Sequence, residues 1–267
     1  MLETLPLSGC IGIEVTGVDI GKPMDDTTYG FLHRALLESN GVLIFRDQFL
    51  APERQHGFAE RWGQPVITPH LAPHAYPGCP AVLRVTNVGK ENAVTENWHS
   101  DSVFLVDPPA LTILAAQEIP SAGGDTMWAN LYAAYDRLSP AMQRLLAPLE
   151  GQFVGSQPDP DTGESRQVIG VHPIVRTHSE TGRKALLIGR PGESVTGFEG
   201  MTPDESRPLL DFLYRHGTQP DLIYRHHWRP GDVVMWDNRC TAHYAVHDYG
   251  DASRTLSRVT VATPDRT

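Results

Sequence analysis

Short apolar stretches separated by polar and glycine-rich segments run along the whole chain, and their period predicts the secondary structure. Residues 11–20 alternate partly between apolar and polar, which is typical of a strand with one buried face. Short continuous apolar runs favour buried strands. Such runs lie at residues 41–45, 82–85, 111–116, 186–188, 233–236 and 259–262. The pattern therefore predicts many short strands.

Helical periodicity marks several of the segments between these strands. The first predicted helix begins after Asp25 and Asp26 and ends at Gly41. The second runs from Pro52, a residue favoured in the first turn of a helix, to about residue 62. Residues 132–149 and 202–217 also carry apolar positions at helical spacing. We expect four helices interspersed with the strands.

Two segments carry no strong pattern. Residues 64–96, apart from the strand at 82–85, and residues 151–170 are rich in proline, glycine and polar residues. Many short strands decorated by helices are typical of a β-sandwich or β-barrel. No repeat or low-complexity linker divides the chain, and 267 residues suffice for one large β-rich domain. We therefore predict a mainly β, single-domain protein spanning residues 1–267.

Composition narrows the classes of partner. The formal net charge of −10, without a basic cluster, argues against a nucleic-acid partner. The chain has no apolar run long enough to span a membrane, and its first residues do not resemble a signal peptide. Its three cysteines are odd in number and widely spaced, which favours a reducing cytoplasm over a disulfide framework. We expect a cytoplasmic protein that does not act on a membrane.

Candidate metal ligands lie far apart in the sequence. His99 and Asp101 are separated by one residue, so on a strand both side chains would share one face. His243 lies far downstream, and only the fold could bring it to them. Two imidazoles and one carboxylate form the donor set of non-haem Fe(II) oxygenases, which leaves positions open for co-substrate and O₂. A His-x-Asp pair alone is more often a hydrogen-bonded surface pair, so further signals are needed.

Two arginines supply such a signal. Arg254 and Arg258 lie four residues apart in a segment that runs into the predicted strand at 259–262. Even spacing on a strand puts both side chains on one face, about 13 Å apart. An arginine on a buried face needs an anion, and the planar guanidinium suits a carboxylate. The anion that each arginine binds would then be a ligand of the protein.

Four passages together resemble the taurine dioxygenase family of Fe(II)- and 2-oxoglutarate-dependent dioxygenases, which includes the 2,4-dichlorophenoxyacetate dioxygenases. Their order and spacing fit this family from about residue 5 to residue 263. The resemblance implies a double-stranded β-helix, or jelly roll, with flanking helices. The passages are Asn97-Trp98-His99-Ser100-Asp101-Ser102, Gly123-Gly124-Asp125-Thr126, Val175-Arg176-Thr177-His178 with Gly182-Arg183-Lys184, and Trp236-Asp237-Asn238-Arg239 with His243 and Arg254.

The resemblance also implies roles for single residues. The iron ligands would be His99, Asp101 and His243, with no further catalytic residue. Thr126 and Arg254 would bind the distal carboxylate of 2-oxoglutarate. The implied reaction hydroxylates a carbon of a small anionic substrate, using Fe(II), 2-oxoglutarate and O₂ and giving succinate and CO₂. In this family the substrates include sulfonates, sulfate esters and aryloxy or alkyl carboxylates.

The substrate pocket departs from the taurine pattern. Arg258 would face the anionic end of the substrate, and His70 matches a histidine that contacts substrate in taurine dioxygenases. His70 is equally well read as a loop histidine bonded to backbone. Pro73 stands where those enzymes have a tyrosine, and Thr95 where they have an asparagine. Both changes remove hydrogen-bonding partners for a small polar substrate, so we expect a larger or more apolar substrate than taurine.

Several alternatives stay open at this point. The same ligands could hold Zn²⁺ in a hydrolase, although Arg254 fits a dicarboxylate co-substrate better. A non-catalytic binding protein would have no need of a complete metal triad. Asp237 and Arg239 either orient His243 or form a buried ion pair that braces a turn. We also expect a homo-oligomer.

Overall fold

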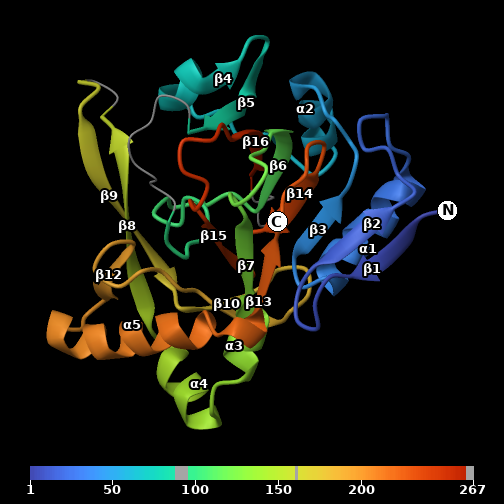
Figure 1. Cartoon of the computed structure of the whole chain (residues 1–267). Helices are drawn as coiled ribbons and strands as arrows, with labels where there is room; N and C mark the ends of the chain where they lie inside the picture. The colour runs from blue at the N-terminus through green and yellow to red at the C-terminus, as the bar shows by residue number, and fades with distance from the viewer. Residues whose placement is uncertain (88–95, 160–161, 263–267) are drawn as a thin grey trace.

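The computed structural model describes residues 1–87, 96–159 and 162–262. Its largest sheet has the strand order β1-β2-β3-β14-β6-β16-β5-β4 (Figure 1). Strands β2 and β3 pair in parallel, and the pairings from β3 through β14, β6 and β16 to β5 are antiparallel. Its strands span Glu3–Pro6 (β1), Ile13–Thr16 (β2), Val42–Phe45 (β3), Ala75–Tyr76 (β4), Cys79–Thr86 (β5), Leu111–Glu118 (β6), Val233–Asp237 (β14) and Thr255–Val261 (β16).

Three smaller sheets complete the β-structure. A three-stranded sheet has the order β13-β7-β15, a second has the order β12-β8-β9, and β10 pairs with β11 as a hairpin. Their strands span Thr126–Asn130 (β7), Glu150–Pro158 (β8), Ser165–Pro173 (β9), Val175–Thr177 (β10), Lys184–Leu186 (β11), Val195–Phe198 (β12), Ile223–His226 (β13) and Thr241–Ala245 (β15).

Helices flank these sheets, as Figure 1 shows. One face of the large sheet packs against α1 and α2 through an apolar core that includes Leu36, Phe58 and Met235. A second core joins α3 and α5 to the smaller sheets. The helical segments span Asp26–Glu38 (α1), Pro52–Glu60 (α2), Pro69–His74 (η1), Leu131–Asp136 (α3), Pro140–Leu146 (α4), Pro203–Gly217 (α5) and Pro220–Leu222 (η2).

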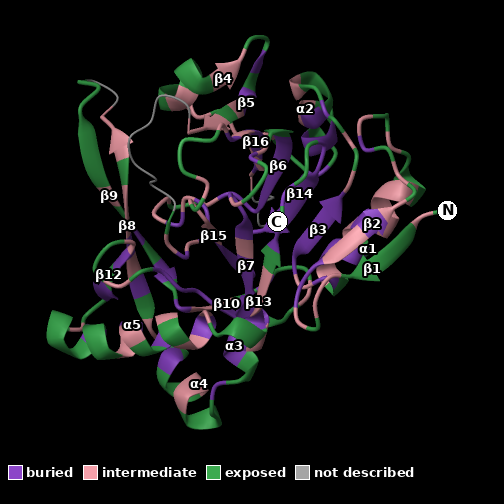
Figure 2. Ribbon diagram, viewed as in Figure 1, coloured by how far each residue is buried: buried purple, intermediate pink, exposed green. Residues whose placement is uncertain are grey.

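The other face of the large sheet looks onto the β13-β7-β15 sheet. Trp128 of β7 lies there with Trp236 of β14 and Leu256 of β16 in a third apolar core. This space between the two sheets is the purple centre of Figure 2, where buried residues of both sheets meet. Two largely antiparallel sheets that close over a shared core form the predicted jelly roll.

Strand register decides which side chains enter the space between the sheets. His243 of β15 pairs directly with Trp128, so both side chains point to the same face of the smaller sheet. On the large sheet, Thr112 pairs with Trp236, and Arg258 pairs with Leu114. These residues therefore face the histidine from the opposite wall. The pairing brings residues that are more than a hundred positions apart to one place.

The predicted helices are confirmed where the sequence contains strong N-capping residues. Helix α1 begins after Asp25, whose carboxylate accepts from the Thr28 N–H, and α5 begins with a capping box formed by Thr202 and Glu205. The single helix predicted at 132–149 is wrong, because the chain forms α3 and α4 with a break between them. Pro140 lacks the N–H that a continuous helix needs, and Ser139 caps the second helix instead.

Two further predictions need correction. In the segment 151–170, which carries no strong sequence pattern, the described residues are mostly those of the antiparallel strands β8 and β9, which pair from Glu150 with Pro173 to Pro158 with Ser165. Strand β9 is largely exposed (Figure 2), so no apolar period marks it. The strand predicted at 11–20 is reduced to β2 and pairs with the unpredicted β1. Within the described ranges, no helix is long and apolar enough to cross a membrane.

Candidate functional site

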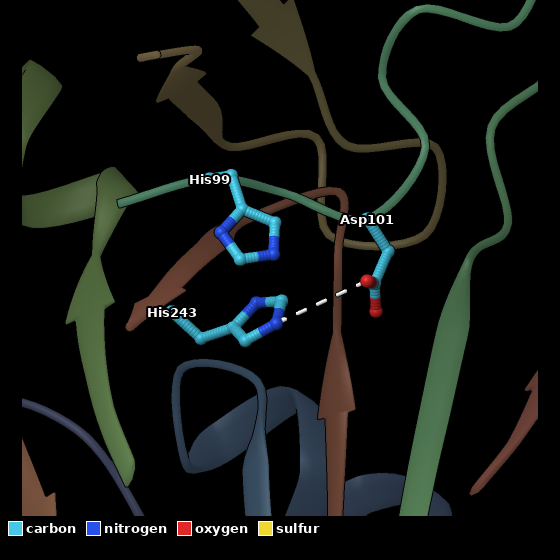
Figure 3. A group of neighbouring side chains, drawn as sticks. All are labelled: His99, Asp101 and His243. Carbon is cyan, nitrogen blue, oxygen red and sulfur yellow. Dashed lines mark ion pairs between the residues drawn. The ribbon is translucent and has the colours of Figure 1, made fainter. Parts of the chain in front are cut away.

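His99, Asp101 and His243 converge in the space between the two sheets (Figure 3). His99 and His243 exchange two backbone hydrogen bonds, of 3.1 and 2.8 Å, in an isolated antiparallel bridge. Their imidazole rings lie with centroids 4.2 Å apart, and Asp101 faces them with Oδ1 3.9 Å from Nε2 of His243. One potential ligand atom from each residue lies within 4.8 Å of the others. The sequence-predicted set is therefore brought together.

The local structure behind this convergence differs from the predicted strand. His99 is in a single bridge, and Asp101 begins a turn in which Ser102 has a φ of +50°. The assumption that strand alternation puts both side chains on one face is therefore wrong. Tertiary hydrogen bonds fix the segment instead, because Ser100 Oγ donates to Thr241 O and the Asp101 N–H donates to Asn238 Oδ1.

The protonation states of the site suit a metal ligand set. Burial raises the pKa of Asp101, but the Arg258 guanidinium and the neighbouring imidazoles outweigh this and hold that pKa well below its ordinary value. Burial, together with the nearby His99, lowers the pKa of His243 to about 3. At neutral pH the carboxylate is thus ionised and the imidazole neutral. These are the forms that bind a metal ion.

Hydrogen bonds around the histidines also fit a metal ion. The Nδ1 atom of His99 lies 2.8 Å from the Asn97 carbonyl oxygen, which fixes the ring and directs Nε2 away from that carbonyl. Nδ1 of His243 is buried without a hydrogen-bond partner among the described residues. A buried polar atom without a partner has lost its contact with water and gained nothing. The atom of His243 that faces Asp101 is Nε2, so the fit to a metal ion rests on the fixed His99 ring and on the donor set, and not on this Nδ1.

Arg254 is a buried cation on the wall of the same space. Its Nε donates to the Gly124 carbonyl oxygen at 2.9 Å, and its Nη2 lies 3.4 Å from Thr126 Oγ1. No carboxylate in the described ranges lies within ion-pair distance of its guanidinium, and burial lowers its pKa. Trp228 Nε1 also donates to Thr126 Oγ1, which leaves the threonine proton free to be donated elsewhere. Arg254 and Thr126 together offer donors to an anionic ligand.

Arg258 and His70 have different surroundings. Arg258 lies in β16 with its Nη2 2.7 Å from Asp101 Oδ1, whereas Arg254 precedes the first residue of that strand, so their common strand face stays a prediction. His70 lies in η1, which directly precedes the edge strand β4, and is exposed; no contact between it and the triad is found among the described residues. Pro73 lies in the same exposed turn. Thr95 is outside the described residues.

Two buried residues without a predicted role contact Asp101. Thr112 of β6 donates from Oγ1 to Asp101 Oδ2 at 2.6 Å, and Asn238 holds both the threonine and the Asp101 backbone. In the sequence, Thr112 interrupts the apolar run Leu111-Thr112-Ile113-Leu114. A single hydroxyl in a buried strand was the one sequence feature that could have pointed to a role for this residue. Asn238 stood in a recognised passage of the sequence. Its contacts depend on the register of β14 and β6, which sequence alone does not fix.

A second cluster of buried polar groups lies beside the first. His178 Nε2 is 3.0 Å from Asp237 Oδ2, and Cys240 adjoins them. The Arg239 guanidinium donates to the same carboxylate at 2.6 Å and continues to Glu180 at 2.7 Å. A bound cation would have to compete with this guanidinium. The cluster is therefore the buried ion pair that braces a turn, which was one of the two predicted interpretations of Asp237 and Arg239.

Comparisons with known proteins agree with this geometry. The chain matches the family "Taurine catabolism dioxygenase TauD, TfdA family" over residues 3–260. It is 35% identical to an alkylsulfatase of Acinetobacter baylyi, covering 98% of this chain and 85% of the relative. It is 34% identical to a (S)-phenoxypropionate/alpha-ketoglutarate-dioxygenase of Sphingobium herbicidovorans, covering 91% and 88%.

A solved structure has the same fold. The crystal structure of a taurine dioxygenase from Burkholderia xenovorans superposes with a TM-score of 0.86 at 33% identity, covering 98% of this chain and 90% of that one. The fold is thus the predicted jelly roll, and the enzyme uses Fe(II) and 2-oxoglutarate with O₂ and a small organic substrate. On this agreement of sequence, fold and site, the chain belongs to the TauD, TfdA family of 2-oxoglutarate-dependent dioxygenases.

Proposed function

We propose that this dioxygenase hydroxylates a carbon of a small anionic substrate, namely a sulfonate, a sulfate ester or an aryloxy or alkyl carboxylate. The observation that carries the proposal is Arg258, a cation on the inner face of β16 whose guanidinium reaches the triad. Its side chain keeps 24% of its surface exposed, so an anion has access to it. The relatives act on sulfate esters and phenoxy acids by their names, which supports the same class.

The roles of the remaining residues follow the same logic. We assign His99, Asp101 and His243 as the iron ligands, because two imidazoles, of which that of His243 is neutral, and an ionised carboxylate surround one point. We assign Arg254 and Thr126 to the distal carboxylate of 2-oxoglutarate, because the buried guanidinium has no carboxylate partner in the described ranges and Thr126 Oγ1 accepts from Arg254 and Trp228, which leaves its proton to be donated. Fe(II) with 2-oxoglutarate and O₂ supplies the oxidant, and succinate and CO₂ are the co-products.

The chain's own residues then do three things. Arg254 neutralises and orients a dicarboxylate at one end of the site, which a flexible lysine would do with less geometric precision. Arg258 holds the anionic group of the substrate at the other end of the site. The carbon chain of the substrate then lies between Arg258 and Arg254. The apolar wall of Trp128, Trp236 and Leu256 keeps water from this space.

A substrate screen tests the proposal. Succinate formation is measured with Fe(II), 2-oxoglutarate and one candidate at a time from sulfonates, sulfate esters, aryloxyacetates and uncharged isosteres. We expect turnover only with the anions, and more with larger or more apolar ones than with taurine, because Pro73 cannot donate a hydrogen bond. Turnover of the uncharged isosteres at equal rates would contradict the role of Arg258. A clear preference for taurine would contradict the expectation of a larger substrate.

The ligand set has a separate test. Anaerobic protein with Fe(II) and 2-oxoglutarate should give the weak visible charge-transfer band of a chelated keto acid, and His99→Ala or His243→Ala should abolish it. A variant that kept the full band would exclude that histidine as a ligand. Five expectations from the sequence stay predictions. They are a single domain spanning residues 1–267, a homo-oligomer, the absence of a nucleic-acid partner, a cytoplasmic location and a substrate contact of His70.

A further inference from the structure

The two carboxylate oxygens of Asp101 have different partners. Oδ2 accepts from the Thr112 hydroxyl at 2.6 Å, whereas Oδ1 faces the Arg258 guanidinium at 2.7 Å and His243 Nε2 at 3.9 Å. Only Oδ1 looks toward the histidines. The two oxygens of this carboxylate are therefore not equivalent in the fold.

Asn238 determines which way the Thr112 hydroxyl points. Its Oδ1 accepts two N–H groups, one from the Asp101 backbone at 3.2 Å and one from the Trp236 indole at 2.9 Å. The amide oxygen is thus fixed, and Nδ2 must donate to Thr112 Oγ1, at 2.9 Å. Because that donation occupies the threonine as an acceptor, its single proton is directed to Asp101 Oδ2.

Burial makes this arrangement hard to replace. Thr112 is fully buried, and Asn238 and Asp101 are nearly so, so water cannot take over a lost bond cheaply. The three groups also come from different parts of the fold: strand β6, the end of β14 and the turn after His99. The register of β6 and β14 fixes Thr112 beside Asn238, because Thr112 pairs directly with Trp236.

We propose that Thr112, oriented by Asn238, is a positioning residue of the metal site that keeps Asp101 Oδ2 occupied and turns Oδ1 toward the histidines. The inference rests on the proposed ligand set. Without the hydroxyl, the carboxylate is free to rotate, or to present both oxygens. A metal ion then meets a less ordered ligand, and its affinity falls. Groups that orient a metal ligand typically change metal affinity about 10- to 100-fold when removed.

Titration with Co(II) alone tests this without turnover. The dissociation constant and the visible Co(II) absorption are measured for the parent, Thr112→Val, which keeps the side-chain shape, and Thr112→Ser, which restores the hydroxyl. We expect about 10- to 100-fold weaker binding and an altered absorption in Thr112→Val, with recovery in Thr112→Ser. Thr112→Ala should behave as Thr112→Val does, and it serves in its place should the valine not fold.

Thr241→Val is the matched control. Thr241 is also fully buried, lies on the strand that carries His243, and donates its hydroxyl to the Asp237 carbonyl oxygen at 2.7 Å rather than to a ligand. The Ser100 hydroxyl bonds the backbone carbonyl of Thr241, which valine keeps, so this variant should lose stability without losing Co(II) affinity. Parent affinity in Thr112→Val and Thr112→Ala, or an equal loss in Thr241→Val, would overturn the inference. His99→Ala tests the ligand set independently of Thr112, because parent Co(II) affinity in that variant would exclude His99 as a ligand.

Discussion

Arg258 Nη2 lies 2.7 Å from Oδ1 of Asp101, the carboxylate oxygen that faces the two histidines. One guanidinium therefore reaches the proposed ligand oxygen while its side chain stays partly exposed. Its charge also contributes most to keeping the pKa of Asp101 low against the opposing effect of burial. The proposed metal and substrate sites thus share a cation, and separate variants can distinguish its roles from those of Arg254.

Arg258→Ala should impair the anionic substrate selectively. The variant removes the proposed partner of the substrate anion but leaves Arg254 and Thr126 in place, because those residues contact each other and Gly124 instead. We expect a large rise in the KM for the best substrate and at most a few-fold change in 2-oxoglutarate affinity. Initial rates of succinate formation, with each substrate varied in turn, measure both constants. Unchanged kinetics with the best substrate would remove Arg258 from the substrate site.

Arg254→Ala should weaken 2-oxoglutarate binding strongly. Removing one partner of a desolvated charge pair costs about 2–5 kcal/mol, which corresponds to roughly thirty- to several-thousand-fold in affinity. The 2-oxoglutarate dependence of the anaerobic charge-transfer band gives this affinity directly. Arg190→Ala is a suitable control, since the Arg190 side chain is half exposed and pairs with the exposed Glu193. Equal affinities in the parent and Arg254→Ala would refute the assignment.

The ion pair behind the site gives a prediction for pH. Burial raises the pKa of Asp237, but hydrogen bonds from His178 and Arg239 outweigh it and lower that pKa to about 2. The folded-state pKa is thus below the ordinary value of 3.8. The stabilisation is complete above about pH 5 and is lost as the pH falls toward 2. Its pH-dependent part is on the order of 2 kcal/mol.

Urea denaturation of the parent and Asp237→Asn between pH 7 and pH 3 measures this contribution. The difference in unfolding free energy should be largest at neutral pH and shrink as the pH falls. Asp221→Asn is the control, because Asp221 pairs with Arg137 on the surface, where screening by water leaves little to lose. A difference between parent and Asp237→Asn that stays constant over this range would show that the carboxylate charge contributes nothing.

Helices α1 and α5 could be predicted from the sequence because their capping residues lie next to the helices in the chain. Asp25 and Thr202 cap α1 and α5 within a few residues of the helix they begin, so no tertiary information is needed. The triad was reached through resemblance, and the strand geometry assumed for His99 and Asp101 was wrong. Their actual placement depends on Asn238 and Thr241, which come from a distant part of the chain.

The β8–β9 hairpin shows why other parts were missed. Its order depends on a partner outside the hairpin, because the Phe104 ring lies against Gly155 and the Phe104 backbone against Gly170. His172 Nε2 adds a contact of 2.8 Å with the Leu105 carbonyl oxygen. A glycine in a strand weakens a local prediction, yet here the absence of a Cβ permits the packing. The loop that this hairpin supports begins at Asp101.

Gly170→Ala should therefore disturb both stability and the metal site. An added Cβ would lie 2.7 Å from the carbonyl carbon and oxygen of Phe104, and backbone atoms cannot move aside as a flexible side chain can. Overpacking of this kind typically costs about 1–3 kcal/mol. The displaced loop carries Asp101, so we also expect weaker Co(II) binding. Urea denaturation and Co(II) titration of the same preparation measure the two effects.

Gly57→Ala is the contrasting variant for this last prediction. Gly57 lies inside helix α2, and nothing lies within 4 Å of a Cβ built there. Alanine in a helix interior is favoured over glycine by about 0.5–1 kcal/mol, so this variant should be more stable than the parent. Its Co(II) affinity should not change, because α2 covers the opposite face of the large sheet. Parent-like stability and Co(II) affinity in Gly170→Ala would mean that the hairpin does not hold the loop, and the metal-binding turn would then owe its geometry to Thr112, Asn238 and Thr241.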